Sequence, residues 1–342
     1  MSRRRALVSL VSRLAVASGW TRLRHLRRRK RGHYRVFILE YHDVSPDDHE
    51  RESVVSRSRF ATHIRHLQKH FPIVSLGTAV DALRYQQLER DLLVITFDDG
   101  LLGNADNAWP VLRDAGATAT IFLTTGFLDG EPLWFDTARR ALEALARVPN
   151  PPSEHRLAGV FDEWPPRSPV SDLVRKLKYH PAPVRRRATA NLATLLEQFD
   201  APRPPARPIP WPTVRALLEQ GVEFGAHTVT HPILSILDGD EQRREIIESR
   251  DRIEAMIGHR PTLFAYPNGS AHDFDQTTVD SLRSSGFNAA CSTIRGANGV
   301  EHDLYRLHRL GVGSDSTAVL DARLAGLFDE ALRVWLRRFR GR

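Results

Sequence analysis

Short apolar runs alternate with segments of helical periodicity along most of this chain, and this alternation restricts the fold more than any other feature. The run Leu92–Ile95 is typical of a buried strand, and the segment from Asn104 to Ala115 has the apolar spacing of a helix. A β-α-β-α order predicts an α/β fold, a parallel sheet covered by helices. We expect strands at 36–41, 72–76, 92–95, 119–123, 222–225, 263–266 and 287–291, and helices at 60–71, 78–88, 104–115, 213–220, 241–257 and 277–285.

The alternation is interrupted between about residues 140 and 210. This stretch holds three proline clusters, and they flank two helical segments at 173–179 and 184–199. Because the same alternation resumes afterwards, we interpret the stretch as an insertion rather than an independent domain. We expect it to lie beside the open end of the fold, where it would cover a substrate.

Two short fragments carry the chemistry. Asp98-Asp99 ends one predicted strand, and His227 and His231 follow another. Histidines at i and i+4 face one point if their segment is helical. Two histidines and one carboxylate form a ligand set for a divalent cation with water in the open position, and the second carboxylate can take a proton from that water. A parallel barrel would gather these strand ends, so the pattern predicts a metal hydrolase.

The net charge of +8 comes from the two ends of the chain. Residues 1–35 contain twelve Arg and Lys and no acid, and residues 333–342 contain five Arg and no acid, so residues 36–332 carry a net charge of −9. An acidic body argues against a nucleic-acid groove on the folded domain. The single cysteine, Cys291, excludes an internal disulfide and a thiolate zinc site within one chain.

The basic segment 1–35 has three interpretations. Its arginines and the apolar stretch that ends at Ala17 are similar to a secretory signal, although Arg13 interrupts the stretch and a second basic block follows. The alternatives, which we favour, are an amphipathic helix on an anionic membrane surface and a solvated basic tail. Residues 317–342 predict a basic amphipathic helix that packs on the domain or touches such a membrane. We find no stretch long and apolar enough to span a bilayer.

Several motifs resemble those of the polysaccharide deacetylase family, also called the NodB-homology domain or carbohydrate esterase family 4. The resemblance extends over about residues 36–312. It is carried by the T-F-D-D-G motif at 96–100, the following strand at 119–122, the G-A-H-T-x-x-H motif at 225–231 and the groove motif at 264–269. The resemblance implies an irregular (β/α)7-type barrel with a helical, proline-rich insertion.

The same resemblance implies the roles of the site residues. Asp98 would be the general base, and a divalent metal would be held by Asp99, His227 and His231. The metal is usually Zn²⁺, with Co²⁺, Ni²⁺ or Fe²⁺ as alternatives. The substrate and the oxyanion would be contacted by the groove motif, Tyr266, Pro267 and Asn268.

The general acid departs from the commonest family pattern. The early segment Leu39–Asp43 resembles that of the poly-β-1,6-N-acetylglucosamine N-deacetylases, in which the acid histidine follows the first strand, and this implies His42. His308 is the alternative. A second departure lies in the groove motif, where Ala265 and Asn268 replace the usual base-tethering arginine and an aromatic residue. Trp134 and Asp136 are candidates for a sugar subsite.

These features predict a hydrolase that removes acetyl groups from an N-acetylhexosamine glycan or glycoconjugate. Residues 36–316 would form the catalytic domain, with the basic segments at 1–35 and 317–342 outside it. The alternatives are a catalytically impaired module that binds glycan or protein, a basic protein bound to membrane or nucleic acid, and a hydrolase of non-sugar amides. The family resemblance favours a cell-envelope or extracytoplasmic location.

Overall fold

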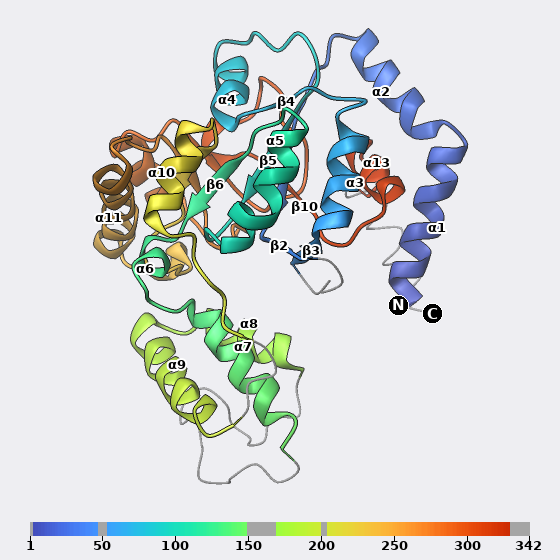
Figure 1. The fold of residues 1–342 in the computed structure, drawn as a ribbon. Helices are drawn as coiled ribbons and strands as arrows, with labels where there is room; N and C mark the ends of the chain where they lie inside the picture. The colour runs from blue at the N-terminus through green and yellow to red at the C-terminus, as the bar shows by residue number, and fades with distance from the viewer. Residues whose placement is uncertain (1–2, 47–52, 149–168, 200–203, 329–342) are drawn as a thin grey trace.

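The computed structural model describes residues 3–46, 53–148, 169–199 and 204–328. Its centre is a sheet with the strand order β10-β1-β5-β6-β7-β8-β9, and all pairs of named strands in it are parallel (Figure 1). The strands are β1 (Val36–Tyr41), β5 (Leu92–Phe97), β6 (Thr120–Leu123), β7 (Glu223–Ala226), β8 (Leu263–Ala265), β9 (Ala289–Cys291) and β10 (Leu310–Gly311), and β4 (Ile73–Val74) pairs with the start of β5.

The segment 307–311 joins the two edges of this sheet. Leu307 forms a bridge with Cys291 at the end of β9, and Leu310 pairs with Leu39 in β1. Backbone hydrogen bonds on both sides hold the segment between these strands. The sheet therefore curls into an irregular (β/α)7-type barrel, which confirms the fold class predicted from the sequence.

The strand period of two decides which side chains enter the barrel. All six positions of β1 are buried, because helices cover the outer face and the barrel interior covers the other. Val36 and Ile38 belong to the apolar cluster inside the barrel, whereas Phe37 and Leu39 belong to the cluster under the outer helices. The same alternation turns Glu40 inward, toward the carboxyl ends of the strands.

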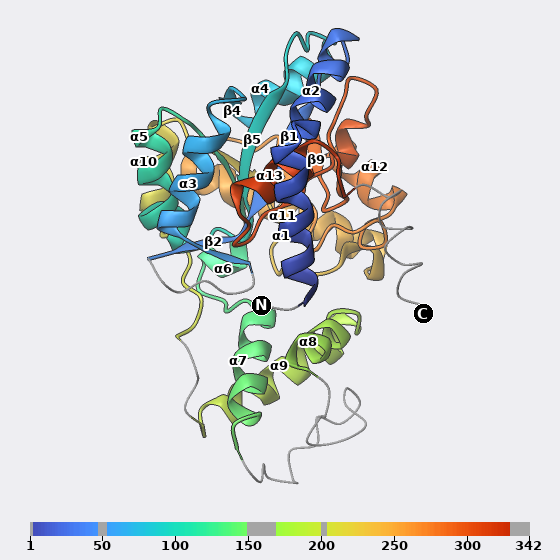
Figure 2. The ribbon, with the colours of Figure 1, turned by 90° about the vertical axis from the view of Figure 1, so that its right-hand side faces the viewer.

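The outer layer is formed by helices that follow the strands in the chain (Figures 1 and 2). They are α3 (Arg57–Leu67), α4 (Leu76–Arg84), α5 (Trp109–Asp114), α10 (Trp211–Glu219), α11 (Gly239–Ile257) and α12 (Gln276–Ser284). Four of them begin at a side chain that accepts a hydrogen bond from the first turn: Ser56, Ser75, Asp238 and Asp275. Local capping signals thus set several of the helix starts.

The insertion packs around an apolar core of its own. It consists of α7 (Trp134–Leu145), α8 (Val170–Lys178) and α9 (Ala182–Leu196), which share the cluster around Leu142, Leu177 and Leu192. Figures 1 and 2 show these helices together at one end of the molecule, away from most of the outer helices. The insertion begins earlier than the sequence predicts, because α7 already belongs to it.

Both predicted terminal segments are helical where the structure describes them. Residues 3–30 form α1 (Arg3–Ala17) and α2 (Trp20–Lys30), joined at Gly19 with φ 71°. α1 packs along α13 (Thr317–Leu324), which ends before Gly326. The predicted helix is therefore not continuous from 317 to 342, and 329–342 lie outside the described residues. None of the helices in the described ranges is long and apolar enough to cross a membrane.

A substitution of Gly225 in β7 tests how tightly the strands pack beneath the site. A Cβ at this position would lie 2.5 Å from Phe122 Cδ1 and 2.8 Å from the Leu263 carbonyl oxygen. We expect Gly225→Ala to lower the free energy of unfolding by about 1–3 kcal/mol, because neighbouring strands must move apart. Thermal unfolding measures the change. Gly313→Ala, whose Cβ would meet no atom within 4 Å, is the control, and equal losses in both variants would contradict the packing argument.

Candidate metal centre and active site

The residues singled out in the sequence lie where strands end. His42 follows β1, Asp98 and Asp99 follow β5, and His227 follows β7. In a parallel barrel these positions share one end, so side chains that are far apart in the chain meet there. Two groups of potential ligands result, each with its atoms within 4.8 Å of one another: Asp99, His227 and His231, and Glu40, His42 and Asp98.

The segment from His227 to His231 is an irregular turn and not a helix, so the helical premise for the two histidines is wrong. Thr228 and His231 adopt positive φ angles of 65° and 55°, which reverse the chain and bring the two rings to 4.9 Å. The Glu245 carboxylate in α11 accepts hydrogen bonds from the backbone N–H groups of Val229 and Thr230. The turn is thus held from outside the site.

Strained backbone is concentrated here. Among the non-glycine residues of the described chain, six have positive φ, and four of these belong to the site: Asp99, Thr228, His231 and Asn268. A positive φ is costly for residues with a Cβ, and it persists where the surroundings enforce it. The surroundings thus hold these four residues in a costly backbone conformation, and this conformation places their side chains in the site.

The three predicted metal ligands converge in a buried position. Asp99 Oδ1 lies 3.4 Å from His231 Nε2 and 3.7 Å from His227 Nε2. His227 Nδ1 lies 2.7 Å from the Ala265 carbonyl oxygen, and since a carbonyl only accepts, Nδ1 carries the proton and Nε2 presents its lone pair. A hydrogen bond from the ring nitrogen that does not bind the metal is the usual way in which a protein orients a histidine ligand.

The electrostatics of this group fit a cation. Asp99 Oδ1, the oxygen that faces both imidazoles, is buried without a hydrogen-bond partner, which is costly for a polar atom unless a ligand compensates. Burial, reinforced by the neighbouring His227, holds the pKa of His231 well below its usual value, so this imidazole is neutral, as a metal ligand must be. Burial raises the pKa of Asp99, a cost that a bound cation would offset.

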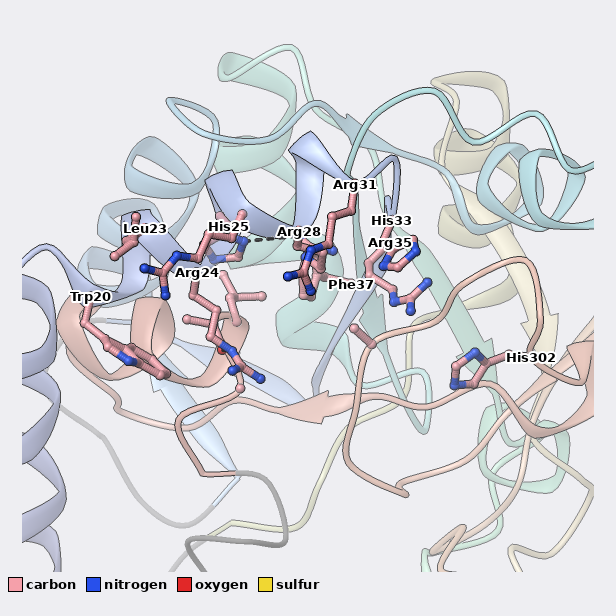
Figure 3. Close-up of a pocket in the computed structure, with 15 residues that line it drawn as sticks. Trp20, Leu23, Arg24, His25, Arg28, Arg31, His33, Arg35, Phe37 and His302 are labelled. Atoms are coloured by element: carbon pink, nitrogen blue, oxygen red, sulfur yellow. Dashed lines mark hydrogen bonds between the residues drawn. The ribbon is translucent and has the colours of Figure 1, made fainter.

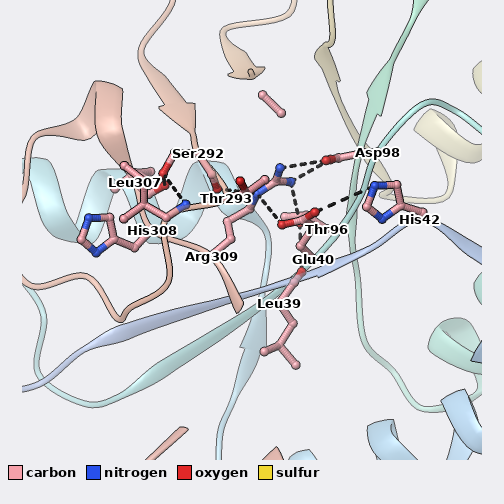
Figure 4. A network of polar contacts seen from close by, with 12 residues as sticks. Leu39, Glu40, His42, Thr96, Asp98, Ser292, Thr293, Leu307, His308 and Arg309 are labelled. Carbon is pink, nitrogen blue, oxygen red and sulfur yellow. Dashed lines mark hydrogen bonds and ion pairs between the residues drawn. The ribbon is translucent and has the colours of Figure 1, made fainter. Parts of the chain in front are cut away.

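Asp98 is held by an arginine that the sequence analysis did not identify. Arg309 Nη1 and Nη2 donate to the two oxygens of Asp98 at 2.7 and 2.8 Å, and both side chains are buried (Figure 4). Burial by itself would raise the pKa of Asp98, but the charge and hydrogen bonds of Arg309, together with the charges of His227 and His42, outweigh burial and hold this pKa well below its usual value. Asp98 is therefore an oriented carboxylate.

Arg309 compensates for the departure in the groove motif. Ala265 stands where the family often carries the base-tethering arginine, and the guanidinium comes instead from the closing segment 307–311. Arg309 also donates to the Ser292 carbonyl at 2.9 Å and lies 3.6 Å from Glu40. The usable sequence signal was an arginine directly before a short apolar strand, but nothing local linked it to Asp98.

His42 lies beside this carboxylate network. Its Nε2 is 3.9 Å from Glu40 Oε1, and Asn104 donates to its backbone carbonyl at 2.7 Å. Burial would lower the pKa of His42, but the charges of Glu40, Asp99 and Asp98 outweigh this effect and raise it. Its side chain is 36% exposed, in contrast to the buried metal-site histidines. A partly exposed, readily protonated imidazole can reach a bound molecule.

Comparison with known proteins identifies the family. The family model described as "Polysaccharide deacetylase" matches residues 85–290, more than half of the chain. This chain belongs to the polysaccharide deacetylase family. His42 and Arg309 both lie outside the span that matches this deacetylase family.

Individual relatives are distant. YxkH of Bacillus subtilis is 20% identical over 277 residues, which cover 80% of this chain and 70% of YxkH. The peptidoglycan-N-acetylmuramic acid deacetylase PdaC of the same organism is 38% identical over 61 residues, only 18% of this chain and 13% of PdaC.

Solved structures share the fold. The deacetylase PplD of Streptococcus pyogenes has a TM-score of 0.57 at 16% identity, over 84% of this chain and 96% of PplD. IcaB of Ammonifex degensii has a TM-score of 0.56 at 19% identity, over 85% of this chain and 97% of IcaB. At such low identity these likenesses support the barrel and not the details of the site.

The deacetylase places its other candidate acid, His308, away from Asp98. His308 packs against His302 with ring centroids 5.1 Å apart, and burial together with His302 lowers its pKa. Its backbone N–H donates to Asn298 Oδ1. In Figure 4 the ring lies on the far side of Arg309 from His42. The geometry therefore favours His42 as the acid.

The groove residues differ in what they offer a substrate. Tyr266 is fully buried and stacks on Phe274, its hydroxyl donates to the Tyr305 carbonyl, and its backbone N–H donates to Cys291. Both of its donors are thus engaged within the protein, which argues against direct contact with the substrate. Pro267 has no N–H. This leaves Asn268, with φ 64°, as the residue whose backbone could donate to an oxyanion.

The two candidates for a sugar subsite instead hold the insertion in place. Trp134 Nε1 donates to the His231 carbonyl at 3.0 Å, and Asp136 accepts from Ala206 N at 3.1 Å. The adjacent Phe135 packs against the His231 ring at 4.9 Å. The insertion is therefore attached at a metal-site histidine.

Arg309→Lys tests the bidentate contact. Lysine keeps the positive charge but cannot grip both oxygens of Asp98, so we expect kcat/KM for acetate release to fall by about 10–100-fold while bound metal stays near the wild-type content. Arg306→Lys, at a partly exposed arginine just before the closing segment, is the control. A fully active Arg309→Lys variant would show that charge alone suffices.

Proposed function

We propose that this family member is a metal-dependent carbohydrate N-deacetylase that acts on N-acetylhexosamine units of a glycan or glycoconjugate. The observation that carries the proposal is the pairing of two groups at one end of the barrel: a buried carboxylate–histidine set and an adjacent acid–base set. Hydrolysis of an unactivated amide needs both a strong electrophile and proton transfer at two atoms.

We propose Zn²⁺ as the metal, held by Asp99, His227 and His231. Two imidazole nitrogens and one carboxylate oxygen suit this ion, and Co²⁺, Ni²⁺ and Fe²⁺ accept the same donors. When bound, the metal would supply Lewis acidity to a water molecule and to the acetamide carbonyl.

Asp98 and His42 would then move the protons. Asp98, oriented by Arg309, takes a proton from a water molecule while the oxygen of that water bonds to the acetyl carbon. His42, which faces the carboxylates of Glu40, Asp98 and Asp99, gives a proton to the nitrogen as the C–N bond breaks. The products are acetate and a free amine. Asn268 N–H is the proposed donor to the oxyanion.

One feature bears on the substrate. The position of His42 after the first strand resembles that in the poly-β-1,6-N-acetylglucosamine N-deacetylases. We therefore place a polymer of N-acetylhexosamine ahead of other amides and propose the cell envelope as the compartment.

A catalytically impaired module that binds glycan or protein is the alternative, favoured by the replacements at Ala265 and Asn268. Arg309 weakens that alternative, because it supplies the contact that Ala265 cannot make. A binding module would not need an oriented base beside a cation site.

Asp98→Asn tests the catalytic base. The amide cannot accept the proton from water, so we expect kcat for acetate release to fall by about 10²–10⁴-fold. Bound metal, measured by elemental analysis, should remain. Asp114→Asn on the exposed end of α5 is the control. Unchanged acetate release would overturn the assignment, and a panel of chitin oligomers, β-1,6-linked oligomers, peptidoglycan and lipid-linked sugars would identify the glycan.

His42→Ala tests the acid. We expect turnover to fall by about 10²–10⁴-fold with the metal retained, because His42 is proposed to protonate the leaving amine and not to bind the ion. His308→Ala should leave turnover close to wild type. Loss of metal with little change in the turnover of the remaining loaded enzyme would make His42 a ligand instead.

A further inference from the structure

A basic cavity lies between α2 and the residues after α13, separate from the active site. It has a volume of about 620 Å³ and is lined by five arginines, Arg24, Arg27, Arg28, Arg31 and Arg35 (Figure 3). Three histidines line it as well, and its lining residues include no aspartate or glutamate. Such a cavity suits an anionic group.

The arginines are only partly neutralised. Arg28 Nη2 binds Asp91 at 2.7 Å, but its Nη1 is buried with no hydrogen-bond partner. Burial, together with the charge of Arg28, lowers the pKa of His25 to about 4, so His25 is neutral at neutral pH. Within the described residues the side chains of Arg27 and Arg31 form no hydrogen bond or ion pair. The cavity therefore keeps donor capacity for a ligand.

Helices α1 and α2, the second of which lines this cavity, carry most of the exposed large apolar side chains. Nine such side chains are exposed on the described part of the chain, and five of them lie on α1 and α2: Leu7, Leu10, Leu14, Leu23 and Leu26, each between 43% and 61% exposed. The other four, Tyr85, Tyr179, Ile236 and Val300, lie on separate elements. The clustering on α1 and α2 marks a contact surface.

α1 turns its larger apolar side chains outward. The spacing of Leu7, Leu10 and Leu14 places them on one stripe, and all three are half-exposed or more. The less exposed positions are the smaller Val8, Ser9, Val11, Ser12, Ala15 and Val16. A helix that served only to cover its neighbours would turn its largest apolar side chains inward. The outer stripe therefore needs an apolar environment that the described residues do not provide.

The charge of residues 1–35 indicates which kind of surface the leucines contact. Residues 1–35 have twelve basic side chains and no acid, and exposed Arg22, Arg27 and Lys30 flank the leucines of α2. Leucines flanked by arginines and lysines are typical of a helix that lies in the headgroup region of an anionic bilayer. Nucleic acid would satisfy the charge but leave the leucines in water. Pairing with the same leucines of a second copy would bring the basic side chains of the two copies together, which like-charge repulsion opposes.

We propose that α1 and α2 bind the surface of an anionic phospholipid bilayer, with the leucine stripes in the headgroup–acyl boundary and a lipid phosphate group in the arginine cavity. This interaction does not depend on the proposed deacetylation. It would hold the barrel at the membrane, because α1 packs on α13 and Arg24 donates to the Ala325 carbonyl at 2.9 Å.

The test is flotation of the full chain with vesicles of phosphatidylcholine alone and of phosphatidylcholine and phosphatidylglycerol in equal amounts. We expect binding to the anionic vesicles and a loss of about tenfold or more in the Leu10→Ser/Leu14→Ser double variant. We expect a loss of similar size in Arg27→Gln/Arg31→Gln, and weaker binding at high salt.

Matched controls separate this surface from general effects. Tyr85→Ser removes an apolar side chain that is 63% exposed elsewhere, and Arg186→Gln/Arg187→Gln removes two exposed charges from α9. Both should bind like wild type. Acetate release from soluble oligomers should be unchanged in the leucine variant, which keeps this test independent of the catalytic proposal.

Three outcomes would overturn the proposal. One is equal flotation of wild type and the leucine variant. A second is a leucine-dependent dimer in sedimentation experiments without vesicle binding. The third is stabilisation of the protein by inorganic phosphate with no binding to anionic vesicles, which would make the cavity a site for free phosphate.

Discussion

The ion pair between Arg309 and Asp98 is the contact on which the proposed site depends. It lies inside the barrel, with neither side chain accessible, and it joins the closing segment to the end of β5. A buried pair of this kind contributes little net stability, since desolvation offsets the attraction. Removing one partner is far more costly, because the other is left as an unpaired buried charge. The pair therefore fixes one arrangement of the barrel end, and the same arrangement points Asp98 at the metal group.

Much of the architecture follows from local signals. β1 was predicted with its observed bounds, and the helices were found within a few residues, because apolar periodicity and capping side chains act over one or two turns. α7 was not predicted because it overlaps the start of the stretch in which the alternation of strands and helices is interrupted. The two-residue β10 is too short to leave a periodic pattern.

The site residues also divide into those that local motifs predict and those that they do not. Asp98, Asp99, His227 and His231 stand in compact motifs, and the structure brings them together at the barrel end. Arg309 could not be assigned because it meets Asp98 across 211 positions of sequence, and no local rule predicts such a contact. The convergence of the two histidines was expected only if 227–231 were helical. The i, i+4 spacing is also compatible with a strained reversal, whose positive φ angles cannot be predicted from the identities of Thr228 and His231.

The late position of the closing segment has a consequence for how the chain is made. Residues 307–311 complete the barrel against β1, which leaves the ribosome long before them. Contacts of such large sequence separation form slowly and only after the intervening chain is available. Until then Asp98 lacks its counter-charge and the first strand has an open edge. A nascent or truncated chain that ends before Arg309 would thus hold the three proposed metal ligands yet lack an oriented base, so hydrolytic competence would be acquired only after Arg309 has been synthesised.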